Sequence, residues 1–458
     1  MIRIKRKIAL AAVVGSLAVV LAGCSTPAAP PSSSAPPADT GTSTTTTTSS
    51  SSAPAGGGPA SAWILSGQPK EDLFQDEFKR WNDANANANI KVEVYANDAY
   101  KEKIRTAIGA GQAPTLVWSW GAFGVVAEYV QAKQIISLDG KVDEALSRVL
   151  PSVADAGKLN GVQVAVPCSD AQPVMLFYNK DLFEKAGVTA PITTWDDLLA
   201  SIPKFKAIGV APFALAGGSK WPNLMWLEYL SDRVGGPQTF NDVKANKPGA
   251  WSSPEMLQAL KYIQDLVKAD GFESGFTSVT ADSNADVALV QTGKAAMILQ
   301  GSWVYGQFKE QNPTMVSGGR LGSFPFPSVP GGKGDPADIA GNPSNFWSVS
   351  ASADPAAQQT AIDWLNKINL DSTMVDGLIA HGGVPPVANA QDKLKASADS
   401  AFLLDAYNLM LNAPNFQASW DQVLPSAAAQ ELLTNLDQIF QGQITPQQFA
   451  DNMNKTIG

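Results

Sequence analysis

The sequence predicts an α/β protein in which helices cover both faces of a largely parallel sheet. From about residue 61 onward, segments with strand periodicity alternate with segments with helical periodicity, which is the pattern of such sheets. The chain has 458 residues, and the roughly 400 of them with a globular composition suggest two domains. In this fold class, ligands collect at the carboxyl ends of the strands.

The first predicted unit alternates regularly between strand and helix. The apolar residues Leu73, Phe74, Phe78 and Trp81 recur at helical spacing between two strand-like segments. The expected order is strand, helix, strand, helix and strand, over 61–67, 70–86, 90–96, 99–111 and 115–120.

A second predicted unit starts near residue 162 and leads into a mostly helical C-terminal region. Gly187 is expected to end one helix, and Thr193 or Thr194 to cap the next, with Asp196 and Asp197 in its first turn. Further elements are expected as helices at 222–236, 254–271 and 285–293, a strand at 294–301, and helices from 355 to 458.

The residues before about 61 predict an export signal and a tether. The apolar run 8–21 is short for a membrane span and follows a positively charged start formed by Arg3, Lys5, Arg6 and Lys7. The run ends in "LAGC", which fits the bacterial lipobox, where the thiol of Cys24 receives diacylglycerol and an acyl chain such as palmitate. An ordinary signal with an incidental cysteine is the alternative. Residues 1–23 are thus expected to be a signal peptide, and 24–60, rich in Ser, Thr, Pro and Ala, to tether a lipid-anchored protein to the outer face of the cytoplasmic membrane.

Composition argues against several classes of function. Loss of the four signal cations changes the formal charge from −9 to −13, which disfavours nucleic acid as a partner and favours a neutral ligand. With Cys24 acylated, Cys168 is the one remaining thiol and His381 the one histidine, so neither a metal site nor a Ser-His-Asp triad is expected. The sequence has no G-x-x-x-x-G-K-[ST] phosphate loop. No cofactor is expected.

Three stretches, in order, resemble signatures of the carbohydrate-type extracellular solute-binding proteins of ABC importers, the superfamily that includes maltose-binding protein. They are "GQAPTLVWSWGAFGVVAEYVQAKQIISLD", "LFYNKDLFEKAGVTAPITTWDDLL" and "GKAAMILQGSWVYGQF". The resemblance extends from Trp63 to Gly458. It implies two lobes with a ligand cleft between them, each lobe a mostly parallel sheet flanked by helices. The first lobe would comprise about 61–167 and 326–365, and the second about 168–325 and 366–458.

Tryptophans are the main candidates for sugar contact, because the C–H faces of sugars stack on aromatic rings. Trp118 and Trp120 lie two residues apart, on one face of a strand, and Trp120 is favoured because it is nearer the following turn. Packing in the core is the alternative for every tryptophan, and it is the favoured interpretation at helical spacing. Alignment with the family motifs implies sugar stacking by Trp303 and Trp420, whereas the two interpretations are evenly balanced for Trp221 and Trp347.

Polar side chains near these tryptophans are expected to bind sugar hydroxyls, since a buried hydroxyl without a partner costs affinity. The candidates are Ser66, Gln68, Asp170, Gln172, Gln300 and Asn345. Gly121 and Ala122 stand where maltose-type members of the family carry charged residues, which argues against maltose as the ligand.

Within the family, the chain resembles actinobacterial binders of β-linked oligosaccharides, especially of the xylobiose type, although glucosides and chito-oligomers share the flat β-1,4 ribbon. The resemblance implies a monomer that closes on a neutral oligosaccharide and delivers it to a two-subunit ABC permease with a cytoplasmic ATPase. It implies a binding protein and not an enzyme. A secreted glycoside hydrolase is the alternative, for which Asp170 and Asp421 are the nearby carboxylates. A structural lipoprotein would not explain the ordered motifs.

Overall fold

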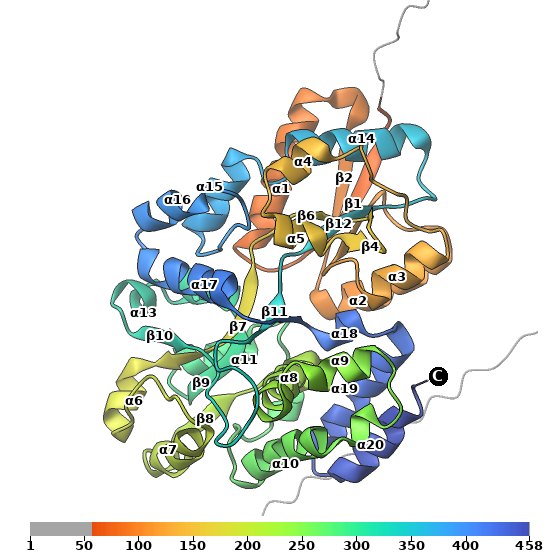
Figure 1. The fold of residues 1–458 in the computed structure, drawn as a ribbon. Coiled ribbons are helices and arrows are strands. Elements are labelled where there is room, and N and C mark those ends of the chain that lie inside the picture. The colour runs from red at the N-terminus through yellow and green to blue at the C-terminus, as the bar shows by residue number, and fades with distance from the viewer. Residues whose placement is uncertain (1–56, 458) are drawn as a thin grey trace, which may run out of the picture. The chain divides into compact units, whose positions relative to one another are not determined.

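A computed structural model describes residues 57–457 of the chain (Figure 1). The predicted signal peptide, Cys24 and nearly all of the predicted tether lie outside the described residues. None of the helices within 57–457 combines the length and the apolar character needed to cross a bilayer.

The first of two main sheets has the strand order β2-β1-β3-β12-β6. Strand β1 pairs in parallel with β2 and β3, whereas β12 runs antiparallel to both of its neighbours. The strands are β1 (Ala60–Leu65), β2 (Ile90–Tyr95), β3 (Leu116–Ser119), β6 (Val166–Pro167) and β12 (Phe346–Val349). Helices α1 (Lys70–Ala84) and α14 (Pro355–Lys367) pack against β1, and α2 (Asn97–Gly109) connects β2 to β3 (Figure 1).

The second main sheet has the strand order β13-β11-β7-β9-β8, with β10 also paired to β7. Its strands are β7 (Gln172–Asn179), β8 (Ala211–Ala214), β9 (Ala295–Gly301), β10 (Leu321–Phe324), β11 (Ile339–Asn342) and β13 (Phe416–Ala418). The outer pairs β8–β9 and β11–β13 are parallel, while β7 is antiparallel to its three neighbours. A small separate hairpin joins β4 (Lys158–Leu159) and β5 (Val162–Gln163).

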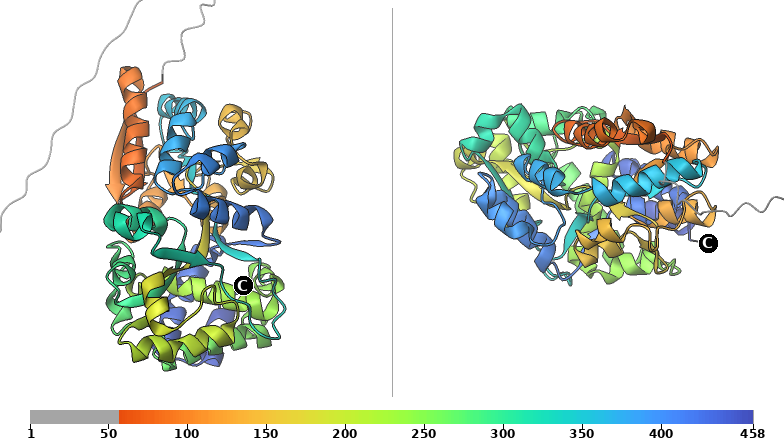
Figure 2. Two further views of the ribbon diagram at one scale, coloured as in Figure 1. Left: turned by 90° about the vertical axis from the view of Figure 1, so that its left-hand side faces the viewer. Right: turned by 90° about the horizontal axis from the view of Figure 1, so that it is seen from above.

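Helices surround both main sheets, as the two further views show (Figure 2). The remaining helices are α3 (Gly124–Gln131), α4 (Asp143–Ser147), α5 (Pro151–Asp155), α6 (Lys180–Ala186), α7 (Trp195–Ala207), α8 (Trp221–Gly235), α9 (Gln238–Lys244), α10 (Pro254–Lys268), α11 (Ala285–Gln291), α12 (Val304–Gln311), α13 (Pro313–Ser317), α15 (Ser372–Ala380), α16 (Ala390–Ala396), α17 (Ser400–Asn412), α18 (Trp420–Val423), α19 (Ser426–Phe440) and α20 (Pro446–Asn454). The α/β class predicted from the sequence is confirmed, but the strand directions are more mixed than expected, because β7 and β12 return antiparallel into their sheets.

The local signals at two helix ends act as the sequence predicts. The hydroxyl of Thr194 accepts a hydrogen bond from the N–H of Asp197 at the start of α7. Gly187 ends α6 with φ of 62°, a left-handed conformation that costs glycine little. These ends fix the direction in which the chain leaves β7 and re-enters the second sheet.

The chain passes between the main sheets three times, and the first two of these crossover segments lie side by side. The chain leaves the first sheet after β6, at Cys168, and returns to it between β11 and β12. The N–H of Cys168 donates to the carbonyl of Asn345 at 2.8 Å, and the N–H of Ser169 donates to the hydroxyl of Ser344 at 3.1 Å. The adjacent crossovers bring polar residues from distant parts of the sequence to one place.

The lobe limits expected from the sequence differ from the observed sheets in two places. The chain re-enters the first sheet only at β12, so β11, which lies inside the segment 326–365, belongs to the second sheet. Helix α15, which was expected in the second lobe, packs against α1 of the first sheet. Hydrophobic patterning cannot assign an element to the first or the second lobe, because it does not reveal against which of the two cores an apolar face packs.

Candidate functional site

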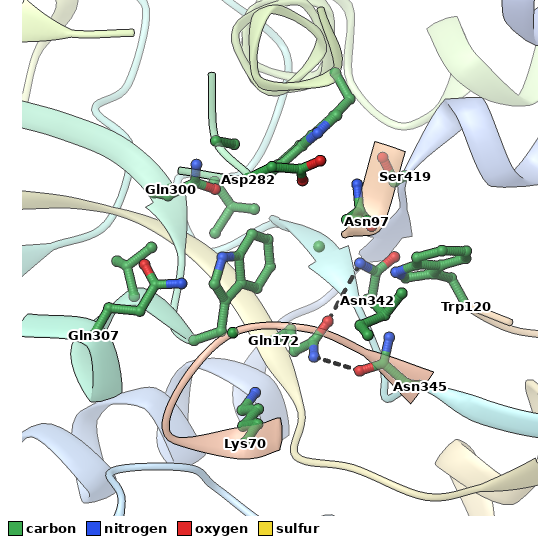
Figure 3. A pocket seen from close by; sticks show the side chains of 18 of the residues that line it. Lys70, Asn97, Trp120, Gln172, Asp282, Gln300, Gln307, Asn342, Asn345 and Ser419 are labelled. Atoms are coloured by element: carbon green, nitrogen blue, oxygen red, sulfur yellow. Dashed lines mark hydrogen bonds between the residues drawn. The ribbon is translucent and has the colours of Figure 1, made fainter. Parts of the chain in front are cut away.

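A cavity of about 190 Å³ lies between elements of the two main sheets. Residues that directly follow β1, β3 and β9 line it, so it lies at the carboxyl ends of strands, as expected for this fold class. The wall also includes the starts of α1, α2, α8 and α12, the strand β7, residues between 281 and 286, the end of β11 and the short helix α18 (Figure 3).

Three partly buried tryptophans, Trp120, Trp221 and Trp303, line the cavity together with the buried rings of Phe74 and Trp118. The rings of Trp221 and Trp303 have centroids 6.1 Å apart and an interplanar angle of 52°. Trp303 lies against the end of β9 because Gly301 leaves room for it: a Cβ atom at Gly301 would lie 1.8 Å from the indole. The glycine before the tryptophan is therefore a steric requirement for this position of the ring.

Gln172, Asn342 and Asn345 form a polar network at the crossovers (Figure 3). The Gln172 side-chain amide donates to Asn345 Oδ1 at 2.7 Å, and Asn342 Nδ2 donates to Gln172 Oε1 at 3.4 Å. All three side chains line the cavity and are less than a tenth exposed. Mutual hydrogen bonds keep these amides oriented toward a ligand.

Five buried polar atoms in the wall have no hydrogen-bond partner within the described part of the chain. The amide oxygens Gln307 Oε1 and Asn342 Oδ1 are acceptors, and the indole nitrogens Trp118 Nε1 and Trp221 Nε1 are donors. The fifth atom is the carboxyl oxygen Glu228 Oε2. An unsatisfied buried polar group costs about 1–3 kcal/mol, which a bound partner recovers. A ligand with several hydroxyl groups suits this set, because a hydroxyl both donates and accepts.

The carboxyl groups that line the cavity have raised pKa values or pair with a lysine, and burial is the main cause of the raised pKa of Glu228, Asp282 and Asp286. Burial raises the pKa of Glu228 to about 8, and the nearby Asp421 adds to this, although hydrogen bonds from Trp420 N–H and Ser419 Oγ oppose it. Burial also raises the pKa of Asp286. Asp421 forms an ion pair with Lys101 at 2.9 Å. The cavity therefore suits a neutral ligand better than an ion.

The cavity brings together nine of the twelve sugar-contact residues proposed from the sequence, which are Ser66, Gln68, Trp118, Trp120, Gln172, Trp221, Gln300, Trp303 and Asn345. Their contact with a ligand stays a prediction. Trp118 is 4% exposed, and its ring packs edge-on against Phe74 and Trp347. Trp120, two residues on, is more exposed, and the preference for Trp120 as the residue facing the cleft stays a prediction.

Three of the proposed residues lie elsewhere, and their assignment to sugar contact is corrected. Trp420 is fully buried and stacks on Phe240 with ring centroids 4.3 Å apart, so only its backbone N–H reaches the site, through Glu228. Trp347 is fully buried beside Trp118. The Asp170 carboxylate lies outside the cavity lining and pairs with Lys70 at 2.5 Å. A motif locates a residue along the chain, whereas packing decides which way its side chain points.

Other lining residues are absent from the sequence-based set: Lys101, Glu228, Gln307 and Asn342. The sequence could have indicated Glu228, because it is an acid within the apolar helical stretch "LMWLEYL", and acids are rarely buried unless they have a partner. No feature of the sequence indicated Lys101, because a lysine on an amphipathic helix usually faces solvent.

Within residues 57–457 no three His, Cys, Asp or Glu side chains are arranged to hold a metal ion. Cys168 is fully buried and unpaired in this range. His381 follows α15, and burial lowers its pKa. Neither residue lines the cavity.

The fold and the cavity define a two-lobed α/β protein that can enclose a small ligand between its sheets. Residues 67–367 match the model of the bacterial extracellular solute-binding protein family, and the chain belongs to this family. The family resemblance of the sequence is thereby confirmed.

Similarities to individual proteins support the assignment to this family. A structure from a study of xylan utilization by the thermophilic bacterium Caldanaerobius polysaccharolyticus is similar with a TM-score of 0.79 and 30% identity, over 87% of this chain and 100% of that one. An uncharacterized extracellular-binding protein of an ABC transporter from Pyrococcus horikoshii is 29% identical over 54% of this chain and 56% of its own length. A xylose/arabinose-binding protein of Haloferax volcanii is 35% identical over 33% of this chain and 32% of its own. The chain thus spans about half the length, or less, of these curated relatives.

Proposed function

We propose that this protein captures a neutral oligosaccharide outside the cell membrane and delivers it to an ABC importer. The observation that carries the proposal is the combination, in one cavity, of three partly buried indoles with five unpartnered buried polar atoms of the described residues. Indoles match the apolar faces of sugar rings, and the polar atoms match their hydroxyls. Membership of the solute-binding family supports transport as the purpose of this binding.

The ligand we favour is a β-1,4-linked oligosaccharide of the xylobiose type. Tryptophans spread along a cavity suit the flat ribbon of such chains. The similarity to a protein studied in xylan utilization, and to one named for xylose and arabinose binding, supports the same choice. Gluco- and chito-oligosaccharides are the nearest competitors because they share the ribbon shape.

Binding is proposed to act by hinge closure at the two adjacent crossovers. Contacts already join the two sides: the N–H of Asp98 donates to Asp282 at 3.2 Å, and Lys101 pairs with Asp421. A sugar that touches both sides favours the closed state by its higher affinity for that state. The loaded monomer would then dock on a two-subunit permease powered by a cytoplasmic ATPase, while the lipid on Cys24 holds it at the membrane.

A single experiment separates this proposal from the hydrolase alternative. The purified chain, beginning after Cys24, is titrated calorimetrically with xylo-, cello-, chito- and malto-oligosaccharides, and each mixture is then analysed for shorter products. Micromolar or tighter binding without products supports a transport protein. Turnover of a bound sugar, or no binding by any series, contradicts the proposal.

A further inference from the structure

A second cavity of about 600 Å³ adjoins the first one. It lies beside α2, the end of β3, the start of α8 and α19. The two cavities share six lining residues, namely Lys101, Trp118, Trp120, Trp221, Asp421 and Gln422. These shared side chains form the partition between the two spaces.

The centre of this partition is a charged pair. Lys101, on α2, pairs with Asp421, on α18, and their side chains are 23% and 6% exposed. The Lys101 ammonium lies 4.9 Å from the ring centroid of Trp120 and 5.9 Å from that of Trp221. It therefore stands between two indoles that line both cavities.

Other contacts hold the carboxylate in place. Ser419 Oγ donates to Asp421 Oδ1 at 3.0 Å, and Gln422 Nε2 donates to Asp421 Oδ2 at 2.8 Å. Lys101, by contrast, is held through its ammonium, at the end of a flexible four-carbon stem. The lysine is thus the movable half of the pair and the aspartate is the fixed half.

We propose that the pair of Lys101 and Asp421 is a gate that sets the length of the oligosaccharide the protein accepts. This inference rests on the proposed sugar-binding function. The first cavity, at about 190 Å³, is smaller than the roughly 300–1,000 Å³ typical of ligand sites, whereas the second is within that range. A short sugar fills the first cavity with the pair intact. A longer chain must pass between Trp120 and Trp221, where the ammonium now lies, and must therefore separate a mostly buried ion pair, which opposes its binding.

Three substitutions test the gate. Lys101→Ala removes the barrier and leaves both indoles exposed to a longer chain. Lys101→Arg keeps a cation that can pair with Asp421. Lys103→Ala is the matched control, because it removes a lysine from the same helix whose exposed side chain contacts Trp63 and Tyr95 and lines neither cavity.

The measured quantity is the ratio of the Kd for xylobiose to the Kd for xylohexaose, by calorimetry, with cello- and chito-oligosaccharide ladders in parallel. The ratio cancels any general loss of affinity. Lys101→Ala is expected to raise it at least about fivefold over the wild type, because a longer chain no longer has to separate the ion pair. Lys101→Arg and Lys103→Ala are expected to leave it within about twofold.

An unchanged ratio in Lys101→Ala overturns the gate while the proposed function stands. An equal rise in Lys103→Ala also overturns it, since the effect would then follow from charge and not from the partition. If the wild-type protein binds none of the three ladders, the proposed function fails and the gate fails with it.

Discussion

Replacing Trp303 with alanine is expected to weaken sugar binding about tenfold. Trp303 is partly exposed at the cavity wall, immediately after β9. A sugar ring lying on its indole would remove about 60 Å² of apolar surface from water, worth roughly 1.5 kcal/mol at ~25 cal/mol per Å². That free energy corresponds to about tenfold in Kd and lies in the range for truncating an aromatic anchor.

Calorimetric titration with xylobiose measures this loss, and thermal unfolding measures stability in the same samples. Trp420→Phe is the comparison, because the family motif also implies sugar stacking by Trp420 but its ring lies in the core. It is expected to lower Tm, since it leaves a cavity, and to keep Kd within about twofold. Wild-type affinity in Trp303→Ala, or an equal affinity loss in Trp420→Phe, would refute the assignment of the cavity wall.

Four further substitutions test separate parts of the site. Gly301→Ala should weaken xylobiose binding nearly as much as Trp303→Ala, because the new Cβ would lie 1.8 Å from the indole and displace it. A Kd equal to that of the wild type, measured by calorimetry on Gly301→Ala, would contradict this. Trp120→Ala should lower affinity by about 1 kcal/mol with little change in Tm, whereas Trp118→Ala should lower stability by about 3–5 kcal/mol, measured by urea unfolding. Glu228→Gln should flatten the pH dependence of Tm. Burial raises the pKa of Glu228 from 4.5 to about 8, so the stability linked to its proton is fully present below pH 4.5 and is lost as the pH rises toward 8. Equal slopes of Tm against pH for the wild type and the variant would contradict that pKa.

Much of the fold could be read from local sequence. Helical spacing of Phe74, Phe78 and Trp81 places one face of α1 in the core, and all three are buried. Thr194 and Gly187 mark helix ends because capping and left-handed turns depend on neighbouring residues alone. The order of strands and helices, and with it the α/β class, follows from such signals.

Part of the candidate site could also be predicted from the sequence. Ser66 and Trp120 follow β1 and β3 of the first sheet, and the carboxyl ends of parallel strands in one sheet meet at a common edge. Trp303 follows β9 of the second sheet, so only the packing of the two sheets brings it to the same cavity. The sequence did not separate Trp303 from Trp420, since both are tryptophans in matching motifs. One lies at the cavity and the other stacks on Phe240, far away in the chain.

The sequence by itself determined most of the helices, the strands β1, β2, β3 and β9, and the residues available at the ends of these strands. Only the tertiary structure decided which side chains share a cavity. Lys101 meets Asp421 across 320 positions of the chain, and Gln172 meets Asn345 across 173. Such contacts depend on how two sheets and two crossovers pack, and no local pattern of residues encodes that packing.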